Sequence, residues 1–203
     1  MKVLLIVDVQ NDFCPGGALP VNGGHEVVPI INSLMEKFDL VIATQDWHPS
    51  GHGSFASTHG KKVGEIADLA GLPQIMWPDH CVRGTKGADF VDTLNIKKIE
   101  RIFQKGTDKD IDSYSGFFDN GRKKATGLAD YLEKKGVTDI YVVGLAIDYC
   151  VKFTALDAVG LGFKTHLIVE GCRGVNLNAG DVEKAIEDME KAGVKIIKEV
   201  RNV

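Results

Sequence analysis

The hydrophobic residues of this chain fall into short runs that alternate with amphipathic segments. Strands buried on both faces of a sheet are typically such dense apolar runs, and we predict strands over residues 3–7, 40–44, 99–104, 140–143, 165–170 and 194–197. Apolar residues at helical spacing predict helices over residues 26–38, 123–135 and 181–192, the last capped by Asp181, and a further one that begins close to Cys150. Strands that alternate with helices indicate an α/β fold, with three α/β/α layers and a mainly parallel central sheet.

Two long segments between these elements lack periodicity. Residues 11–24 are rich in glycine and proline, which indicates a loop, and no helical or strand pattern is visible from Pro49 to Gly87. Long loops in compact domains are often functional. The glycines of the first loop lack the spacing of a phosphate-binding fingerprint, and no helix follows the first strand directly, so dinucleotide binding is excluded.

Composition narrows the class of protein. No linker divides the 203 residues, of which 44% are hydrophobic, so we expect one domain over residues 1–203. A net charge of −4 argues against nucleic acid and membrane as partners and favours a small molecule. The chain begins directly with a strand pattern, and no apolar run approaches the roughly 20 residues of a membrane span, so a cytoplasmic location is expected. The cysteines form no C-x-x-C pair, and we expect free thiols.

Cys150 is a candidate nucleophile. It follows the strand over residues 140–143, and Asp148 is a suitable N-cap for the helix that would begin near the thiol. A helix N-terminus lowers the pKa of a cysteine and favours an anion above the same turn. A lone cysteine behind a strand is nevertheless more often structural, so further residues are needed.

Asp8 and Lys105 supply that support. Each ends a predicted strand, and the carboxyl edge of an open α/β sheet is where sites are built. A carboxylate, an ammonium and a thiol that meet at this edge would act as base, pKa-lowering cation and nucleophile.

A metal site is also predicted. Asp46 and His48 lie two residues apart on an extended segment and therefore point to the same side, and His80 offers a third ligand. Two histidines and one carboxylate suit Zn, Fe or Mn about equally. His52 and His59 compete for a place in this shell.

Taken together, these motifs resemble those of the nicotinamidases and pyrazinamidases, within the isochorismatase-like hydrolases. The matching segments run through most of the chain in the family's order: residues 8–13 (DVQNDF), 46–49 (DWHP), 77–81 (WPDHC), 105–106 (KG), 114–117 (YSGF) and 144–151 (GLAIDYCV). Some family members place a further histidine six residues after the first metal ligand. Here that position is Ser54, so the resemblance leaves water to complete the shell.

The resemblance implies an amidohydrolase that converts nicotinamide to nicotinate and ammonia in NAD salvage, with pyrazinamide as a further substrate. Asp8, Lys105 and Cys150 would be catalytic, and the backbone N–H groups of Ala146 and Cys150 would form the oxyanion hole, with a cis peptide between Leu145 and Ala146. Three aromatic residues would bind the ring, whose nitrogen would face the divalent ion; these are Phe13, Trp77 and Tyr114.

Two alternatives stay open at this point. A sister hydrolase of the same fold could cleave another C–N or enol-ether bond, although such enzymes generally lack the set Asp46, His48 and His80. A metal-binding or thiol-redox protein would need a resolving partner for Cys150, and no neighbouring cysteine offers one. The sequence leaves metal identity open, as well as assembly into a homo-oligomer.

Overall fold

The central sheet has six strands, all parallel, in the order β5-β2-β1-β6-β7-β8. The structure is a computed structural model that describes residues 1–203. The strands of this sheet are β1 (Lys2–Val7), β2 (Leu40–Asp46), β5 (Arg101–Lys105), β6 (Asp139–Leu145), β7 (Lys164–Arg173) and β8 (Lys195–Ile197). The six predicted strands and the parallel sheet are therefore confirmed, with β2, β6 and β7 longer than their apolar runs.

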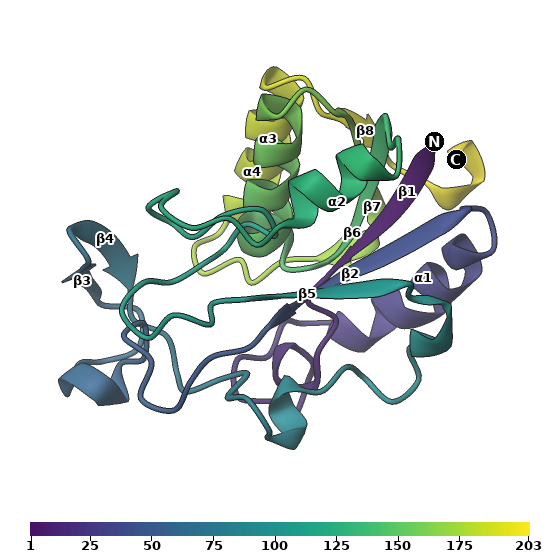
Figure 1. The fold of residues 1–203 in the computed structure, drawn as a ribbon. Coiled ribbons are helices and arrows are strands. Elements are labelled where there is room, and N and C mark those ends of the chain that lie inside the picture. The colour runs from purple at the N-terminus through teal and green to yellow at the C-terminus, as the bar shows by residue number, and fades with distance from the viewer.

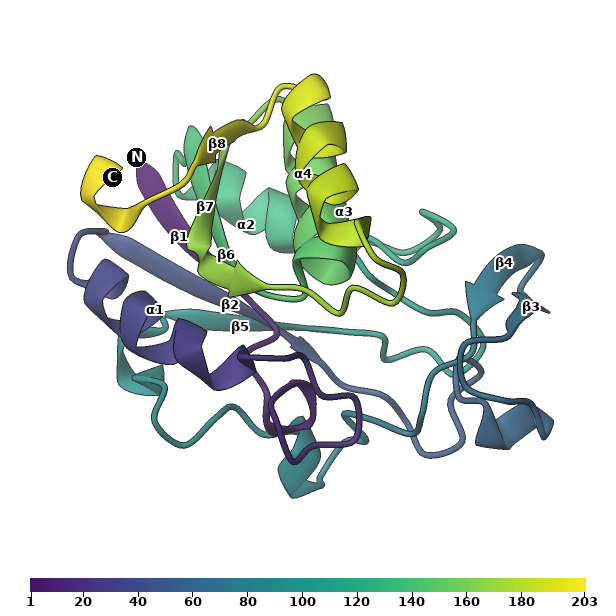
Figure 2. The ribbon, with the colours of Figure 1, turned by 180° about the vertical axis from the view of Figure 1, so that it is seen from behind.

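Helices cover both faces of the sheet, as expected for three layers. α1 (Val27–Met35) lies on one face, and α2 (Leu128–Lys134), α3 (Lys152–Gly160) and α4 (Asp181–Lys191) lie on the other (Figures 1 and 2). Both termini lie at the same end of the molecule, close to the start of β1. No helix has the length and apolar character that crossing a membrane requires.

β1 and β6 form the buried centre of the sheet. Val3 to Val7 are fully buried, and the apolar residues of β6 are almost as well covered. The two strands approach closely at Gly144, whose φ is +119° and where an added Cβ would lie 2.1 Å from the carbonyl oxygen of Val7. Only glycine fits at this position, because any side chain would separate the strand that leads to Cys150 from β1.

The carboxyl ends of these strands bring the predicted catalytic positions together. Asp8 directly follows β1, and Asp46 and Lys105 are paired in register at the ends of β2 and β5. Asp8 has a φ of +49°, a left-handed conformation that is uncommon outside glycine. The parallel register therefore places three charged side chains at one edge of the sheet.

Residues 49–87 are more regular than the sequence indicated. They contain a projecting antiparallel hairpin of β3 (Ile66–Leu69) and β4 (Leu72–Ile75), visible beyond the carboxyl edge of the sheet (Figure 1). Ala70 and Gly71 form its two-residue turn, both with positive φ. Four-residue strands are too short to show a periodicity, and Ala-Gly is a weaker turn signal than Asn-Gly.

The helix predicted over residues 123–135 is shorter than expected, because its first residues belong to a loop. Ala125 pairs with Phe118 in an isolated antiparallel bridge, and Thr126 donates its backbone N–H to Phe117. α2 begins only after Gly127, whose φ is +85°.

The predicted helix caps Asp148 and Asp181 are wrong. Ile147–Val151 forms a π-helical turn ahead of α3, and the Asp148 carboxylate instead accepts hydrogen bonds from the backbone N–H groups of Val175 and Asn176. Gly180 occupies the N-cap of α4, while Asp181 accepts from the N–H of Asn178. Both aspartates therefore bind backbone N–H groups of loops instead of capping the N-terminus of a helix.

Candidate active site

Cys150, Lys105 and Asp8 lie together at the carboxyl edge of the sheet. Lys105 Nζ is 3.4 Å from Cys150 Sγ and 2.9 Å from Asp8 Oδ2. All three side chains are buried. The other oxygen of Asp8 accepts a hydrogen bond from the Thr44 hydroxyl at 2.7 Å, whereas Oδ2 receives no well-aligned hydrogen bond despite the nearby ammonium. Asp8 Oδ2 therefore retains the capacity to accept a proton.

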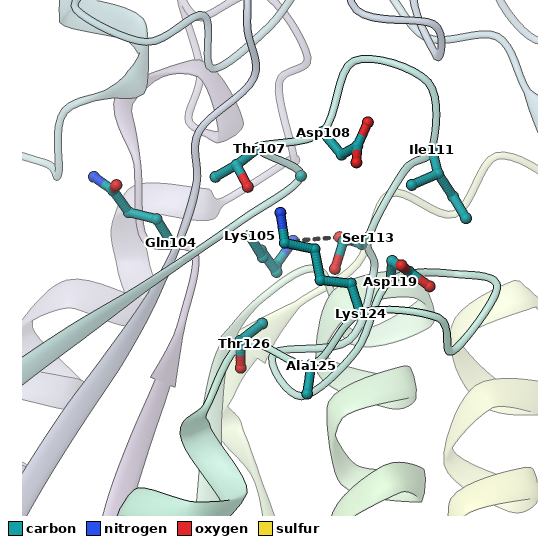
Figure 3. Close-up of a pocket in the computed structure, with 11 residues that line it drawn as sticks. Gln104, Lys105, Thr107, Asp108, Ile111, Ser113, Asp119, Lys124, Ala125 and Thr126 are labelled. Atoms are coloured by element: carbon teal, nitrogen blue, oxygen red, sulfur yellow. Dashed lines mark hydrogen bonds between the residues drawn. The ribbon is translucent and has the colours of Figure 1, made fainter.

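The Lys105 ammonium is fixed by more than this pair. It donates to Asp46 Oδ1 at 2.7 Å and to the carbonyl oxygen of Ser113 at 2.9 Å, the contact drawn in Figure 3. Two carboxylates and one carbonyl thus surround a fully buried ammonium, and this compensates the cost of burying its charge. The same arrangement holds the ammonium against the thiol.

The electrostatics differ from the low thiol pKa that a helix N-terminus would give. Burial raises the pKa of Cys150 well above its usual value, and the Lys105 ammonium opposes this rise. Burial also raises the pKa of Asp8, again against Lys105. The sequence-based expectation of a lowered pKa is wrong for the resting site, because Cys150 lies inside a buried turn beside Asp8 and Asp46. The thiol thus needs a base to remove its proton.

Asp46, His48 and His80 form a second buried cluster beside these residues. Asp46 Oδ2 is 3.5 Å from His48 Nε2 and 3.8 Å from His80 Nε2. The two rings are oriented through their other nitrogen: His48 Nδ1 donates to the carbonyl of Gly106 at 2.9 Å, and His80 Nδ1 donates to that of Pro78 at 2.7 Å. Each Nε2 therefore faces the carboxylate, and in the neutral form of either ring it would offer its lone pair to a metal ion.

The residues present fit a divalent metal ion. His48 Nε2 is buried without any hydrogen-bond partner, and bonds of about 2.1 Å to a tetrahedral ion would place ligand atoms roughly 3.4 Å apart, close to the spacing found here. Burial and His48 lower the pKa of His80 to about 4, so this ring is neutral near pH 7. Burial would raise the pKa of Asp46, but Lys105 and His48 hold it well below its usual range. The cluster is a possible metal site.

His52, Ser54 and His59 make other contacts. His52 Nδ1 accepts hydrogen bonds from the backbone N–H and the hydroxyl of Ser54, so its Nε2 carries the proton and faces the carbonyl of Ile111 at 3.3 Å. His59 Nε2 lies 2.8 Å from the carbonyl of Gly53. The His52 ring packs against that of His48, with centroids 4.3 Å apart and the two planes tilted by 32°.

A small apolar pocket opens onto Cys150 and the His80 side of the cluster. Its empty space, which includes the part open to solvent, is about 380 Å³. Its lining includes all three aromatic residues singled out from the sequence, together with the expected oxyanion residue; these are Phe13, Trp77, Tyr114 and Ala146. The Leu145–Ala146 peptide is cis, as the resemblance implied.

Sequence reasoning missed four residues of this pocket, Leu19, Asp112, Tyr149 and Val175. Tyr149 packs edge-on against Trp77, with ring centroids 5.0 Å apart. Its position directly before Cys150 was a signal that could have identified it. The others come from loops whose path the sequence does not reveal.

Gln10 is a further residue that the sequence did not single out. Its side-chain amide accepts from the backbone N–H of Asp46 and donates to the carbonyl of Asp46, both at 2.8 Å, and also donates to Ala88. The chain turns away from β2 after Asp8, so this amide takes the place of a peptide group beside β2. Gln10 thereby fixes the backbone of one candidate ligand.

Gly106 leaves room for the ring of a second candidate ligand, His48. An added Cβ at Gly106 would lie 2.4 Å from His48 Cε1, so a side chain here would displace the imidazole. The φ of Gly106 is +63°, which also favours glycine.

A second cavity, lined mostly by polar residues, lies against Lys105 and Ser113 (Figure 3). Lys124, Asp119 and Thr126 face into it. Neither Cys150 nor the cluster of Asp46, His48 and His80 lines it. The chemistry described above therefore belongs to the apolar pocket.

Comparison with known proteins identifies the family. The isochorismatase domain model matches residues 2–199. A nicotinamidase of Escherichia coli is 48% identical over 199 residues, which cover 96% of this chain and 93% of that protein. A solved nicotinamidase/pyrazinamidase of Acinetobacter baumanii superposes with a TM-score of 0.96 at 44% identity, covering 100% of this chain and 98% of the other. A Pyrococcus horikoshii pyrazinamidase, solved with zinc, has a TM-score of 0.80 at 38% identity and covers 98% and 99%. The chain therefore belongs to the isochorismatase family.

Proposed function

We propose that this protein is a nicotinamidase, an amidohydrolase that converts nicotinamide to nicotinate and ammonia. The observation that carries the proposal is the convergence of Cys150, Lys105 and Asp8 at a pocket with aromatic walls. The nicotinamidases that match nearly the full chain support the same activity. The presence of Asp46, His48 and His80 beside the thiol disfavours a sister hydrolase without a metal site.

The reaction begins with removal of the thiol proton. Asp8 Oδ2 takes this proton, and the Lys105 ammonium stabilises the thiolate that forms. Cys150 Sγ then attacks the carboxamide carbon, and the backbone N–H groups of Ala146 and Cys150 receive the developing oxyanion. Each such donor contributes on the order of 3 kcal/mol to transition-state stabilisation.

Asp8 serves both halves of the reaction. When the tetrahedral intermediate collapses, the C–N bond breaks and the Asp8 carboxyl returns its proton to the departing nitrogen, which leaves as ammonia. The deprotonated Asp8 then takes a proton from water, whose oxygen attacks the thioester carbon. The C–S bond breaks, nicotinate is released, and Cys150 regains its proton from Asp8.

The pocket walls account for an aromatic amide as substrate. Phe13 and Trp77 bind the two faces of the ring, and Tyr114 lies at its side. The pocket excludes most water because its walls are mainly apolar, which strengthens the electrostatic contacts around the thiol. Pyrazinamide has the same shape, and we propose it as a second substrate.

Asp46, His48 and His80 would hold one divalent ion, Zn, Fe or Mn. When bound, this ion supplies a Lewis-acid contact for the ring nitrogen of the substrate. Gln10 and Gly106 keep the backbone of Asp46 and the ring of His48 in place for it. A role in NAD salvage, a cytoplasmic location and assembly into a homo-oligomer remain predictions.

Ammonia release by the purified protein tests the proposal. We expect release from nicotinamide and from pyrazinamide, each with a stoichiometric carboxylic acid product. No ammonia above the buffer blank from either amide, with a folded and metal-loaded protein, would reject the function.

A further inference from the structure

Gln74 is a buried amide in a hairpin that is otherwise largely exposed. It lies in β4 with 3% of its surface accessible, while neighbouring positions of β3 and β4 are open to solvent. Its Nε2 lies 3.0 Å from Asp112 Oδ2, 3.0 Å from the Tyr114 hydroxyl and 2.8 Å from the carbonyl of Ile75. A residue of the projecting hairpin thus reaches two residues that line the substrate pocket.

The Tyr114 hydroxyl joins Gln74 to a second wall of the pocket. It accepts a hydrogen bond from Trp77 Nε1 at 3.1 Å as well as the one from Gln74 Nε2. Two donors therefore fix one oxygen, and the rings of Tyr114 and Trp77 cannot shift independently. Buried networks of this kind hold their members rigidly when every group is satisfied.

We propose that Gln74 is a positioning residue for substrate binding, which sets the places of Trp77 and Tyr114 and thereby the affinity of the pocket for an aromatic amide. The inference rests on the proposed function. Gln74 does not line the pocket itself, so it acts only through the residues it holds. It should therefore affect binding of the ring and leave the chemistry at Cys150 unchanged.

The chemistry of the partners dictates a glutamine here. A carboxylate such as that of Asp112 only accepts hydrogen bonds, so the side chain opposite must donate. A methionine at position 74 would fill a similar volume without donating. A glutamate would place a second carboxylate against Asp112. We therefore expect substrate affinity to be highest in the wild-type protein, lower in Gln74→Met and lowest in Gln74→Glu.

Gln74→Met is the main test, with Gln45→Met as the matched control. Gln45 is also a buried glutamine, and it donates to the carbonyl of Ala88 and accepts from Gln104 without lining the pocket. For Gln74→Met we expect KM for nicotinamide to rise about tenfold with kcat within twofold, the scale of one lost buried hydrogen bond. Nicotinate affinity, measured by calorimetry, should fall by the same factor. Gln45→Met should match wild type in both.

Alkylation of Cys150 by iodoacetamide separates positioning from general damage. Its rate should stay at the wild-type value in Gln74→Met, because the reagent needs no aromatic wall. A KM and a nicotinate affinity within twofold of wild type would overturn the inference. So would a slowed alkylation that parallels the loss of nicotinate binding, since that result indicates a disturbed site rather than a displaced wall.

Tyr114→Phe keeps the inference testable if Gln74→Met does not fold. This variant removes the shared hydroxyl and keeps the ring, and it should raise KM with kcat retained. Where Gln74→Met does fold, the effects of the two changes on KM should not add in the double variant, because both changes break the same link. An unchanged KM in Tyr114→Phe, or additive effects, would contradict it. Wild-type protein without ammonia release would reject the proposed function instead.

Discussion

Lys105 Nζ lies 2.7 Å from Asp46 Oδ1, while Asp46 Oδ2 faces the Nε2 atoms of His48 and His80. One buried carboxylate therefore serves the ammonium beside the nucleophile and the possible metal site together. A change at Asp46 should disturb both groups, whereas a change at a histidine should disturb the metal site more selectively.

Substitution of the metal cluster should separate these two effects. His80→Ala should lower the bound divalent metal, measured by elemental analysis, and the affinity for nicotinamide, while Cys150 still reacts with iodoacetamide at a rate close to wild type. Asp46→Ala should lose metal and also change the alkylation rate, because Lys105 loses its closest partner and the thiol loses a nearby carboxylate. His59→Ala is the control, since His59 faces only the carbonyl of Gly53. A metal-free protein with full activity would refute this role of the cluster.

The losses caused by substitutions in the catalytic set should not add. Asp8→Asn and Lys105→Ala should each reduce kcat/KM by at least about 10³-fold, and the double variant should be no worse than the more damaged single, because the residues act as one unit. Steady-state ammonia assays on the three variants provide the comparison. Strictly additive losses would mean that the two residues contribute independently.

Nicotinamide should be hydrolysed far better than benzamide. Benzamide keeps the ring shape, and therefore the contacts to Phe13 and Trp77, but it lacks the nitrogen that would face the ion at Asp46, His48 and His80. Sites that bind a polar group reject analogues without it by about 10⁴-fold, and the loss should appear mainly in KM. Equal kcat/KM for the two amides would leave the metal cluster a structural role.

Gln10→Ala should weaken metal binding without direct contact to the metal. The Gln10 amide holds the backbone N–H and carbonyl of Asp46, and loss of such outer contacts typically costs about 10- to 100-fold in metal affinity. Titration of the metal-free protein with Zn²⁺ against a competing chelator measures the effect. Gln45→Ala should bind metal as wild type does. The Gln45 amide donates to the carbonyl of Ala88, as Gln10 does, but it makes no hydrogen bond to the backbone of Asp46. Equal weakening in both variants would point to a general loosening of this edge.

The sequence predicted those parts of the fold that repeat a simple pattern. Apolar runs identified the central strands β1, β2 and β6 most clearly, because strands buried on both faces must be apolar throughout. The edge strands β5 and β8 were also predicted, although their burial is only partial. The hairpin of β3 and β4 was missed because four-residue strands carry too little periodicity. The caps Asp148 and Asp181 were misassigned because an aspartate beside a helix can bind a loop equally well, a choice that tertiary contacts decide.

The sequence predicted those residues of the candidate site that lie at the ends of strands. Asp8, Asp46 and Lys105 meet because parallel register aligns their strands. Phe13, Trp77 and Tyr114 were placed at the pocket by family resemblance, and the structure brings all three to it. Gln10 and Gln74 could not be recognised from the sequence, since their importance lies in hydrogen bonds to residues that are distant along the chain. The thiol pKa was mispredicted for two reasons. Burial raises the pKa of Cys150, and the thiol lies in a π-helical turn rather than at the N-terminus of an α-helix.

The central claim is that Cys150 forms a covalent bond to the acyl group of nicotinamide, and acid-quench mass spectrometry tests it most directly. Wild-type protein mixed with excess nicotinamide and quenched within one turnover should carry one nicotinoyl group, located on the peptide that contains Cys150. Cys150→Ala, folded as wild type by circular dichroism, should carry no adduct and release ammonia below about a thousandth of the wild-type rate. A Cys150→Ala protein that still releases ammonia at a substantial rate, or a nicotinoyl group on another residue, would contradict the account.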